Sequence, residues 1–519
     1  MKKTGSSYLK RTLLPLLIFS LITGVMTGVV IFLFKIASTW VIGMSENIFS
    51  SARHNAWLIP AVILGAALIG LLSAIVLRFS PECRGGGIPS AIAALRGQVP
   101  IKNVISLPFV FLASLLTYIC GVPLGTEGPA VQMGTLVGWT TSRVFGKKNR
   151  AWHRYVMTGG ACAGFAAATG APLTGIFFAF EEAHRRFTPM IFMSAALTTL
   201  FSSVTMELLC MASGISSSLF GFTVAEVMSV KYMWSALLVG LVSGGFAILF
   251  TKSYKAVNKL LGRAFSRIPF ILRIVLIFVS VAVIGLLSAE LVGTGHHLVD
   301  ELIEGHGVWY LLIIYLLVRS IFLMIANTQG VTGGLFIPSL AIGAMLGSLC
   351  AKGMISIGIL PEKFAIVCVI IGMVSFLAAS SRVPITALAF SLEALSGFSN
   401  FLPIAIGVAV AFTVIETVGI HSFNDTVVDM KIAERNRGKE VYERDVELIV
   451  MKDAFVIGRE VRDILWPPEC LVVSMIKNPD SPHDRGGIGE GDMLCVHYRT
   501  AHPEFIADRL EELVGKQHF

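Results

Sequence analysis

The chain has 519 residues, of which 55% are hydrophobic and only 14% are charged. Soluble domains carry about 25% charged residues, so this composition excludes an ordinary soluble enzyme and indicates a polytopic membrane protein. The net charge of +8 is uneven: residues 430–519 hold 13 basic and 17 acidic side chains, and the first 429 residues hold 28 and 16. A basic excess on a membrane protein usually marks its cytoplasmic face rather than nucleic-acid binding. The eight cysteines are scattered and show no paired spacing.

Membrane-crossing segments can be predicted along most of the chain. The first, residues 12–36, is longer than a signal-peptide core, and the basic residues before it (Lys2, Lys3, Lys10 and Arg11) predict a cytoplasmic N-terminus. Runs long enough to cross about 30 Å of hydrocarbon begin near Thr12, Trp57, Asn103, Met190, Tyr232, Ile268, Trp309 and Phe401. Shorter runs, broken by glycine and proline, lie near Gly87, Gly128, Gly159, Ala171, Phe336, Phe364 and Val383. Broken helices are tolerated only where protein buries them or they line a cavity, and they mark the binding site of many transporters.

An internal repeat divides this apolar body into two halves. At an offset of 209, Gly125, Pro129, Gly134 and Gly138 match Gly334, Pro338, Gly343 and Gly347. At an offset of 212, Gly160, Ala166, Ala167, Pro172, Thr174, Phe178 and Glu181 match Gly372, Ala378, Ala379, Pro384, Thr386, Phe390 and Glu393. Coincidence in an apolar alphabet is the alternative, but prolines in register argue against it. We predict homologous halves at about 12–213 and 232–423, and from these residues alone they could be parallel or inverted.

The polar tail resembles a small α+β module. Residues 446–451, 470–476 and 492–498 are β-branched runs separated by turn residues, which predicts three strands. Residues 503–514 predict a closing amphipathic helix. The module is either a solubilising appendage or a regulatory or dimerising domain.

Three glycine–proline segments stand out in the body: Gly85-Gly86-Gly87-Ile88-Pro89, Gly125-Thr126-Glu127-Gly128-Pro129 and Gly333-Gly334-Leu335-Phe336-Ile337-Pro338. Each places a proline just inside a predicted helix start, where its missing N–H costs nothing. The free N–H groups of the first turn and the positive end of the helix dipole make an anion site without a basic side chain. The alternative for each segment is a kink that only permits close packing, but three segments together favour an anion site.

Glu127 is the most informative single residue. A carboxylate within a membrane segment is costly and is usually functional. At a helix N-terminus its own carboxylate could occupy the anion site, and protonation would release that site to another anion. One residue could thus couple proton binding to anion binding. The alternative is a helix-capping acid with no role in transport.

With these motifs, residues 13–434 resemble the CLC family of chloride channels and chloride/proton exchangers. The family signatures Gly-Ser-Gly-Ile-Pro, Gly-Lys/Arg-Glu-Gly-Pro and Gly-x-Phe-x-Pro correspond to residues 85–89, 125–129 and 334–338. The resemblance implies an all-α fold with two inverted repeats of full and broken helices, and a homodimer with one ion pathway per subunit. It implies that Glu127 is the external gate and that the N–H groups of Leu335 and Phe336 hold the central anion. The further anion-binding positions that it implies are Gly86, Gly87, Ile88, Thr126, Gly128 and Phe423.

Two departures from the family pattern affect this site. The family's serine hydroxyl falls on Gly86, and its central tyrosine hydroxyl falls on Phe423. Two side-chain donors are then missing, which leaves the preference for chloride open. We predict that central chloride binding is weaker, by about tenfold or more, than in a Gly86→Ser, Phe423→Tyr double variant. Thr126 stands where the family often has a basic residue.

Glu182 distinguishes an exchanger from a passive channel, because exchangers of the family carry a glutamate there and many channels do not. The resemblance implies that it relays protons from the cytoplasm. Glu181 has a repeat mate in Glu393, which indicates a structural role. Glu181 and His184 have a spacing that could ligate a metal, but no further ligands accompany them. His296-His297 and Trp466-Pro467-Pro468 are interpreted as loop or turn features.

We therefore expect a plasma-membrane anion transporter over residues 1–435 and a cytoplasmic domain over residues 436–519. The tail weakly resembles the TrkA-C module of bacterial potassium-transport regulators, with an unknown ligand, and suggests a prokaryotic source. Chloride/proton exchange is favoured, with a voltage- or pH-gated chloride channel or an exchanger of another small anion as alternatives. A membrane enzyme is disfavoured, because no HExxH or Ser/His/Asp set is present. The expected partners are chloride, protons, lipid and a second subunit, with no cofactor or metal.

Overall fold

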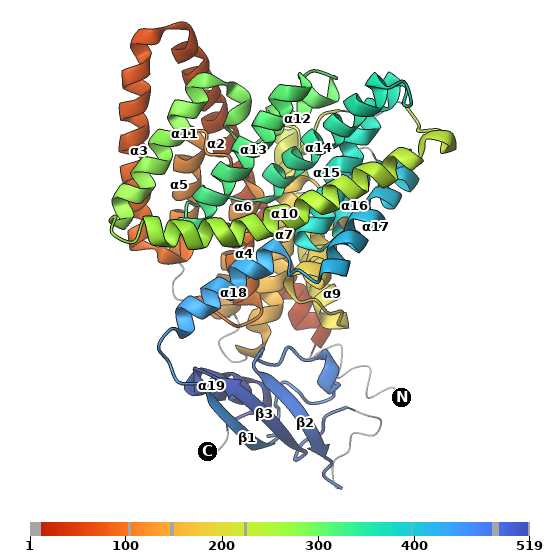
Figure 1. Ribbon diagram of the computed structural model, residues 1–519. Coiled ribbons are helices and arrows are strands. Elements are labelled where there is room, and N and C mark those ends of the chain that lie inside the picture. Colours follow the sequence, from red (N-terminus) through yellow and green to blue (C-terminus); the bar gives the residue numbers. More distant parts are fainter. Residues whose placement is uncertain are drawn as a thin grey trace.

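The computed structural model describes residues 12–101, 105–145, 150–222, 226–395, 397–479 and 487–516. Lys2, Lys3, Lys10 and Arg11 lie outside these ranges. A body of helices carries a small three-stranded module at one end (Figure 1). The body helices are α2 (Leu14–His54), α3 (Ile59–Phe79), α4 (Ile88–Leu95), α5 (Ser106–Ile119), α6 (Glu127–Phe145), α7 (His153–Thr169), α8 (Pro172–Phe178), α9 (Pro189–Ser213), α10 (Trp234–Ala264), α11 (Phe270–Leu287), α12 (His296–Ile303), α13 (Trp309–Thr328), α14 (Phe336–Ser356), α15 (Ala365–Ser381), α16 (Pro384–Ala394), α17 (Phe401–Val418) and α18 (Phe423–Asn436).

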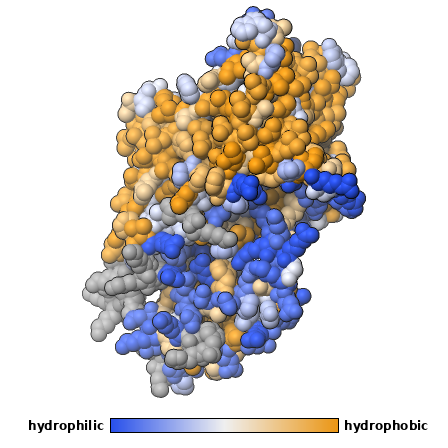
Figure 2. Space-filling model, turned by 90° about the vertical axis from the view of Figure 1, so that its left-hand side faces the viewer, coloured by the Kyte–Doolittle hydropathy of each residue, from blue (hydrophilic) through white to orange (hydrophobic). Residues whose placement is uncertain are grey.

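Nine helical segments among the described residues are long and apolar enough to cross a membrane. A wide apolar band covers the face of the body seen in Figure 2, whereas the module and its junction are hydrophilic. The predicted polytopic helical fold is therefore confirmed. Several predicted lengths were wrong, including that of the run near Phe364, which belongs to a 20-residue apolar helical segment, Glu362–Ser381. The run near Asn103, itself outside the described residues, is the 14-residue α5, which ends just before Gly121 with its positive φ of 68°. The run near Phe336 is the 21-residue α14, because its glycines pack against α15 without breaking the helix.

The two repeats are related by a pseudo-two-fold axis, as the backbone around their matching residues shows. Gly125 and Gly334 are repeat mates and exchange both backbone hydrogen bonds, at 2.7 and 2.6 Å. The helices α6 and α14, which follow these glycines, are also repeat mates. Such a reciprocal pair requires the two strands of backbone to run antiparallel. The halves are therefore related by a pseudo-two-fold axis that passes between these two glycines.

A second reciprocal contact joins α8 and α16. The carboxylate of Glu181, just after α8, accepts the N–H groups of Ile385 and Thr386 at the start of α16, at 2.9 and 2.7 Å. Glu393, near the end of α16, accepts the N–H groups of Leu173 and Thr174 at the start of α8, at 2.7 and 2.8 Å. Each acid caps the helix N-terminus of the other repeat. The structural role expected for Glu181 follows from this contact.

Glycine lets neighbouring helices within each repeat touch backbone to backbone, at matching positions of the two repeats. A Cβ on Gly134 of α6 would lie 2.1 Å from the carbonyl oxygen of Gly160 of α7. A Cβ on Gly343 of α14 would lie 2.4 Å from the carbonyl oxygen of Gly372 of α15. Small residues are enriched where membrane helices approach closely, because lipid provides no hydrophobic drive for association. This packing buries the interior of the body around the three glycine–proline segments.

The module at the end of the chain is an antiparallel sheet with strand order β1-β3-β2, closed by a helix. Its elements are β1 (Tyr442–Ile449), β2 (Cys470–Ile476), β3 (Met493–Thr500) and α19 (Pro503–Val514). The predicted strand at 470–476 and the helix at 503–514 are confirmed with their bounds. Strand β1 begins and ends earlier than predicted, because it pairs residue by residue with β3 from Tyr442 to Ile449.

A buried aspartate organises the turn before β3. Asp492 accepts the N–H groups of Asn478 and Gly489 at 2.9 and 2.7 Å, and the ammonium of Lys477 lies 3.0 Å away. Burial raises the pKa of Asp492, but these donors outweigh it and hold the pKa below its ordinary value. Gly489-Glu490-Gly491-Asp492 is therefore a structural turn.

The module is docked onto the body through backbone groups of residues 463–466. The buried hydroxyl of Tyr155 accepts the N–H of Leu465 at 3.0 Å and donates to the carbonyl of Asp463 at 3.2 Å. Arg154 donates to the carbonyls of Leu465 and Trp466 at 2.8 and 2.9 Å. Arg186 donates to the carbonyl of Ile464 at 2.9 Å. The interpretation of Trp466-Pro467-Pro468 as a loop feature holds, and this loop is the docking segment.

Candidate functional site

The three glycine–proline segments meet inside the body. A Cβ on Gly87 would lie 2.2 Å from the carbonyl of Gly128, and a Cβ on Gly128 would lie 2.6 Å from the Cα of Gly334. Gly87 has a φ of 58°, a conformation that favours glycine. Segments from distant parts of the chain are therefore in direct backbone contact, and any side chain at these positions would separate them.

Four helices begin at this junction or beside it. Helix α4 starts at Ile88, α6 at Glu127 and α14 at Phe336, each with a proline in its first turn. Helix α18 starts at Phe423, which faces the same cavity as Ile88 and Phe336. Free first-turn N–H groups and the positive ends of the helix dipoles favour an anion there. The arrangement can stabilise negative charge without a basic side chain.

Glu127 lies fully buried at the junction. The hydroxyl of Thr126 donates to its Oε1 at 3.1 Å. Its Oε2 lies 2.6 Å from the position that a Cβ on Gly125 would take, and the ring of Pro338 lies 3.1 Å from the same position. The carboxylate therefore folds back over Gly125, toward the start of α14. A carboxylate at this position is stabilised by the helix N-termini described above.

A narrow cavity of about 10 Å³ continues from the junction. A single water needs roughly 10–15 Å³, so this cavity is barely large enough for one water molecule. The ring of Phe336 is held edge-on by Phe165 and Phe390, with centroid separations of 5.0 and 4.9 Å. The predicted site residues that line this cavity are Ile88, Glu182, Leu335, Phe336 and Phe423. Gly86, Gly87, Thr126, Glu127 and Gly128 lie at the junction instead.

Glu182 reaches this cavity from the turn after α8 and is 8% exposed. The side-chain amide of Asn424 donates to its carboxylate. Arg96 donates to the carbonyl of Glu182 at 2.8 Å and also pairs with Asp425 at 2.9 Å. The glutamate is thus fixed against the first turn of α18. Asn424 was missed from the sequence, although it directly follows Phe423.

Two further polar residues lie beside the site and were also missed. Tyr254 of α10 packs edge-on against Phe423, with ring centroids 4.4 Å apart, and its hydroxyl donates to Asn327 at 2.8 Å. The amide nitrogen of Asn327 lies 2.9 Å from the position that a Cβ on Gly86 would take. An asparagine within the apolar helix α13 was the available signal, because buried polar groups in membrane helices are usually functional.

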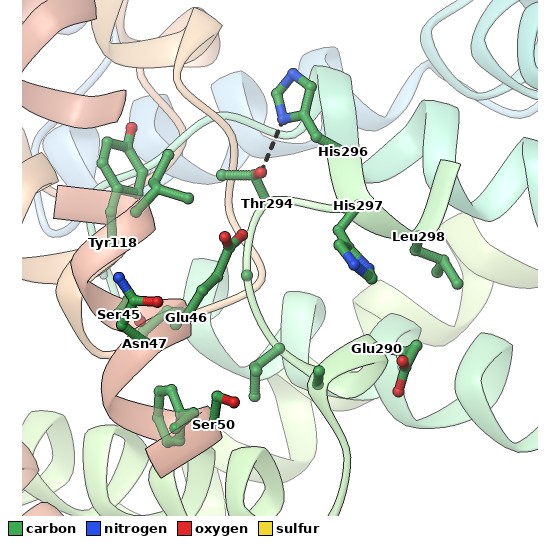
Figure 3. A pocket seen from close by; sticks show the side chains of 18 of the residues that line it. Ser45, Glu46, Asn47, Ser50, Tyr118, Glu290, Thr294, His296, His297 and Leu298 are labelled. Atoms are coloured by element: carbon green, nitrogen blue, oxygen red, sulfur yellow. Dashed lines mark hydrogen bonds between the residues drawn. The ribbon is translucent and has the colours of Figure 1, made fainter. Parts of the chain in front are cut away.

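A separate pocket of about 260 Å³ opens at the other end of the body, away from the module. Figure 3 shows Glu46 of α2 facing the loop that carries Thr294, with His297 on the opposite wall. Thr294 and His296 are hydrogen-bonded at 2.9 Å. The hydroxyl of Tyr118, also in this wall, donates to the carbonyl of Gly125 at 2.9 Å and so links the pocket to the Glu127 loop.

The interpretation of His296-His297 as a loop feature was wrong. These residues open α12, with Gly295 before them in a left-handed conformation at φ 110°. Because this helix has only eight residues, its apolar pattern is too short to stand out from the surrounding loop. Both histidines line the pocket of about 260 Å³.

Glu181 and His184, considered as a pair of metal ligands, form hydrogen bonds with different partners. The carboxylate of Glu181 caps α16, and the imidazole Nε2 of His184 lies 2.7 Å from the hydroxyl of Thr158. Among the residues that the structure describes, no group of three or more histidine, cysteine, aspartate or glutamate side chains could hold a metal ion.

Comparisons with known proteins agree with this architecture. The family model described as "voltage gated chloride channel" matches residues 65–416. The H(+)/Cl(−) exchange transporter ClcA of Salmonella paratyphi B is 27% identical over 440 residues, covering 82% of this chain and 90% of the relative. ClcA of Cronobacter sakazakii is 28% identical over 441 residues, covering 83% and 92%. The crystal structure of a slow cyanobacterial Cl−/H+ antiporter superposes with a TM-score of 0.73 at 24% identity, covering 81% of this chain and 99% of that one. A CLC-type fluoride/proton antiporter superposes with a TM-score of 0.65 at 19% identity, covering 79% and 97%.

Proposed function

The chain belongs to the voltage-gated chloride channel family, and from this premise we propose that it exchanges chloride for protons across the cell membrane. It is a multi-pass membrane protein for anion transport of the CLC type, and this family is not one of enzymes. The observation that supports the proposal is the burial of two glutamates, one at the helix junction and one on the cavity beside it. These are Glu127 and Glu182, respectively. The exchange activity in the names of the relatives supports the same function.

In the proposed mechanism, Glu127 is both gate and proton carrier. Its deprotonated carboxylate fills the outer anion position at the helix N-termini, flanked by Thr126 and Gly128. A proton neutralises the carboxylate, which frees the N–H groups and the helix dipoles for an entering anion. Anion entry and proton binding therefore depend on each other.

In this mechanism, backbone groups hold the central anion. The N–H groups of Leu335 and Phe336, at the start of α14, donate to it, and Gly86, Gly87, Ile88 and Phe423 surround it. Glu182 relays the proton from the other side of the membrane to this passage, held in place by Asn424. An internal relay must be close to the passage but must not fill the anion position, and the turn after α8 meets both requirements.

Transport by the purified protein in liposomes tests this proposal. We expect a chloride gradient to drive proton movement in the wild type. Glu127→Gln should carry chloride without protons, because the neutral amide resembles the protonated gate. Glu182→Gln should keep measurable chloride flux and lose coupled proton flux. Glu181→Gln is the matched control: its side chain caps α16, so coupling should persist.

Two outcomes would contradict the proposal. Proton movement driven by chloride in Glu127→Gln would refute the gate. A wild type that dissipates a chloride gradient without moving any protons would favour a passive channel, gated by voltage or pH.

An exchanger of another small anion is the second candidate. It is favoured by Gly86 and Phe423, which carry no hydroxyl at the positions where the family has serine and tyrosine. Competition between chloride and a panel of small monovalent anions, measured as inhibition of chloride flux in liposomes, would identify the preferred one. If the protein prefers another anion to chloride by tenfold, that anion would take the place of chloride in the proposal above.

We also propose that the end of the body bearing the module faces the cytoplasm, and that residues 436–519 form a regulatory domain of the TrkA-C type. Basic residues contact the module at this end, among them Arg154 and Arg186, and a basic excess favours the cytoplasmic side. The family resemblance supports a homodimer with one pathway per subunit. Protease accessibility in oriented vesicles and native mass spectrometry would test the orientation and the oligomeric state.

A further inference from the structure

Asn327 presents a buried hydrogen-bond donor that is unused within the structure. The residue lies at the end of α13 and is 5% exposed. Its side-chain oxygen accepts the hydroxyl of Tyr254 at 2.8 Å, whereas its Nδ2 has no hydrogen-bond partner among the described residues. A buried N–H without a partner costs about 1–3 kcal/mol. An unpaired buried donor therefore calls for an explanation, and a bound ion is one.

The position of this donor links it to the anion passage. A Cβ on Gly86 would lie 2.9 Å from Asn327 Nδ2 and 3.4 Å from a methyl group of Leu335. Gly86 belongs to the first glycine–proline segment, and Leu335 precedes α14 and lines the narrow cavity of about 10 Å³ described above. The amide therefore occupies the space into which a side chain at position 86 would project. Glycine at position 86 and asparagine at position 327 are complementary in volume.

Tyr254 fixes the orientation of the amide. It is 1% exposed, and its ring packs edge-on against Phe423, with centroids 4.4 Å apart. Its hydroxyl engages the amide oxygen of Asn327, which leaves the NH2 group turned toward Gly86. Phe423 in turn lines the same narrow cavity. A layer of three side chains thus runs from the cavity wall to the donor.

We propose that Asn327 Nδ2 donates a hydrogen bond to the transported anion at the level of Gly86, with Tyr254 as its positioning residue. This inference rests on the proposed anion transport and adds a specificity-determining residue to that site. The NH2 group is a donor with no acceptor, so it suits an anion, and the narrow cavity beside Leu335 suits a small one such as a halide. The amide supplies the donor that a glycine at position 86 cannot supply.

Chloride titration calorimetry on the purified full-length protein tests the donor directly. Asn327→Leu keeps a similar volume and removes the N–H, so we expect chloride affinity to fall about tenfold, the factor that corresponds to about 1.4 kcal/mol. Tyr254→Phe keeps the ring against Phe423 and releases the amide, and should weaken binding by a smaller factor. Gly86→Ser alone should not strengthen binding, because its Cβ would lie 2.9 Å from the amide nitrogen.

A compensating pair separates a binding role from a packing role. Asn327→Ala should bind chloride about tenfold more weakly, and adding Gly86→Ser to that variant should recover most of the loss, because a hydroxyl then has room to donate. A merely structural asparagine would not be rescued by a serine on a different segment. If Asn327→Leu does not fold, the comparison of Asn327→Ala with the double variant decides alone.

The failure of this inference can be distinguished from the failure of the proposed function. A wild type that binds chloride, together with an Asn327→Leu variant of equal affinity, would refute the donor and leave anion transport in place. Absence of rescue in the double variant would also refute the donor. A wild type that neither binds chloride nor moves any small anion in liposomes would refute the proposed function itself.

Discussion

Removing one hydroxyl, in Tyr155→Phe, should loosen the module from the body. Tyr155 is 1% exposed, and its hydroxyl bonds the N–H of Leu465 and the carbonyl of Asp463. Phenylalanine keeps the ring contacts with Trp152 and Phe455, at centroid distances of 6.2 and 5.9 Å. The lost hydroxyl leaves the buried N–H of Leu465 unpaired, which costs about 1–3 kcal/mol. The undocked population should therefore rise by a factor of about 5–150.

Hydrogen exchange of the backbone amides in residues 461–468, followed by mass spectrometry on the detergent-solubilised protein, measures this change. We expect their protection to fall by at least about fivefold, with little change in the β-strands. Tyr442→Phe is the matched control, because its hydroxyl bonds only the exposed Glu440, at 3.4 Å. Unchanged protection in Tyr155→Phe would refute the reasoning.

The same variant addresses the role of the module. The docking segment of the module contacts Arg186, which lies four residues after Glu182 in the sequence. If the module is regulatory, loosened docking should change the rate of transport in liposomes. Loosened docking with unchanged rates would instead favour a solubilising appendage.

Four further substitutions, in three experiments, have defined outcomes. Glu181→Ala and Glu393→Ala should each destabilise the protein by about 1–3 kcal/mol, because each uncaps a helix N-terminus of the other repeat. Unfolding by SDS titration should show similar losses of stability for the two variants. A loss of stability in only one of them would contradict the pseudo-symmetric capping. Asp492→Asn should destabilise the module by about 1–3 kcal/mol at pH 7. The folded-state pKa of Asp492 is lowered, so the stability difference between wild type and variant should be complete above the ordinary aspartate pKa near 4. It should vanish as the pH falls through the lowered pKa. Thermal unfolding of both proteins from pH 7 to pH 3 measures this difference, and a constant difference would contradict the assignment. Gly87→Ala places a Cβ 2.2 Å from the carbonyl of Gly128 at a positive φ, so it should abolish anion flux in liposomes, and wild-type flux would show that the junction is not tightly packed.

Much of the fold could be predicted from local patterns. Hydrophobic run length identified most of the membrane helices, and the three proline-marked starts at Ile88, Glu127 and Phe336 coincide with observed helix starts. Proline in the first turn and glycine before it are local signals, because they act on the backbone of their own residues. The eight-residue α12 was missed for the complementary reason: a short helix carries too few residues to show a period.

The partners of the site residues could not be predicted in this way. Glu182 and Asn424 are 242 positions apart, and Tyr254 and Asn327 are 73 apart. The sequence showed that Gly86 lacks a hydroxyl, but not that an amide from α13 stands in its place. The sequence revealed two repeats but not their relative orientation, because identities along the chain carry no direction in space.

The sequence by itself determined that this is a two-repeat membrane protein with three proline-capped helix starts and a carboxylate at one of them. These features depend on composition, period and the conformational limits of glycine and proline, all of which are local. Only the tertiary structure decided that the three starts touch, that the repeats run antiparallel and that Asn327 faces Gly86. Those facts depend on packing between helices distant in sequence, where a gap of a few tenths of an ångström separates contact from clash.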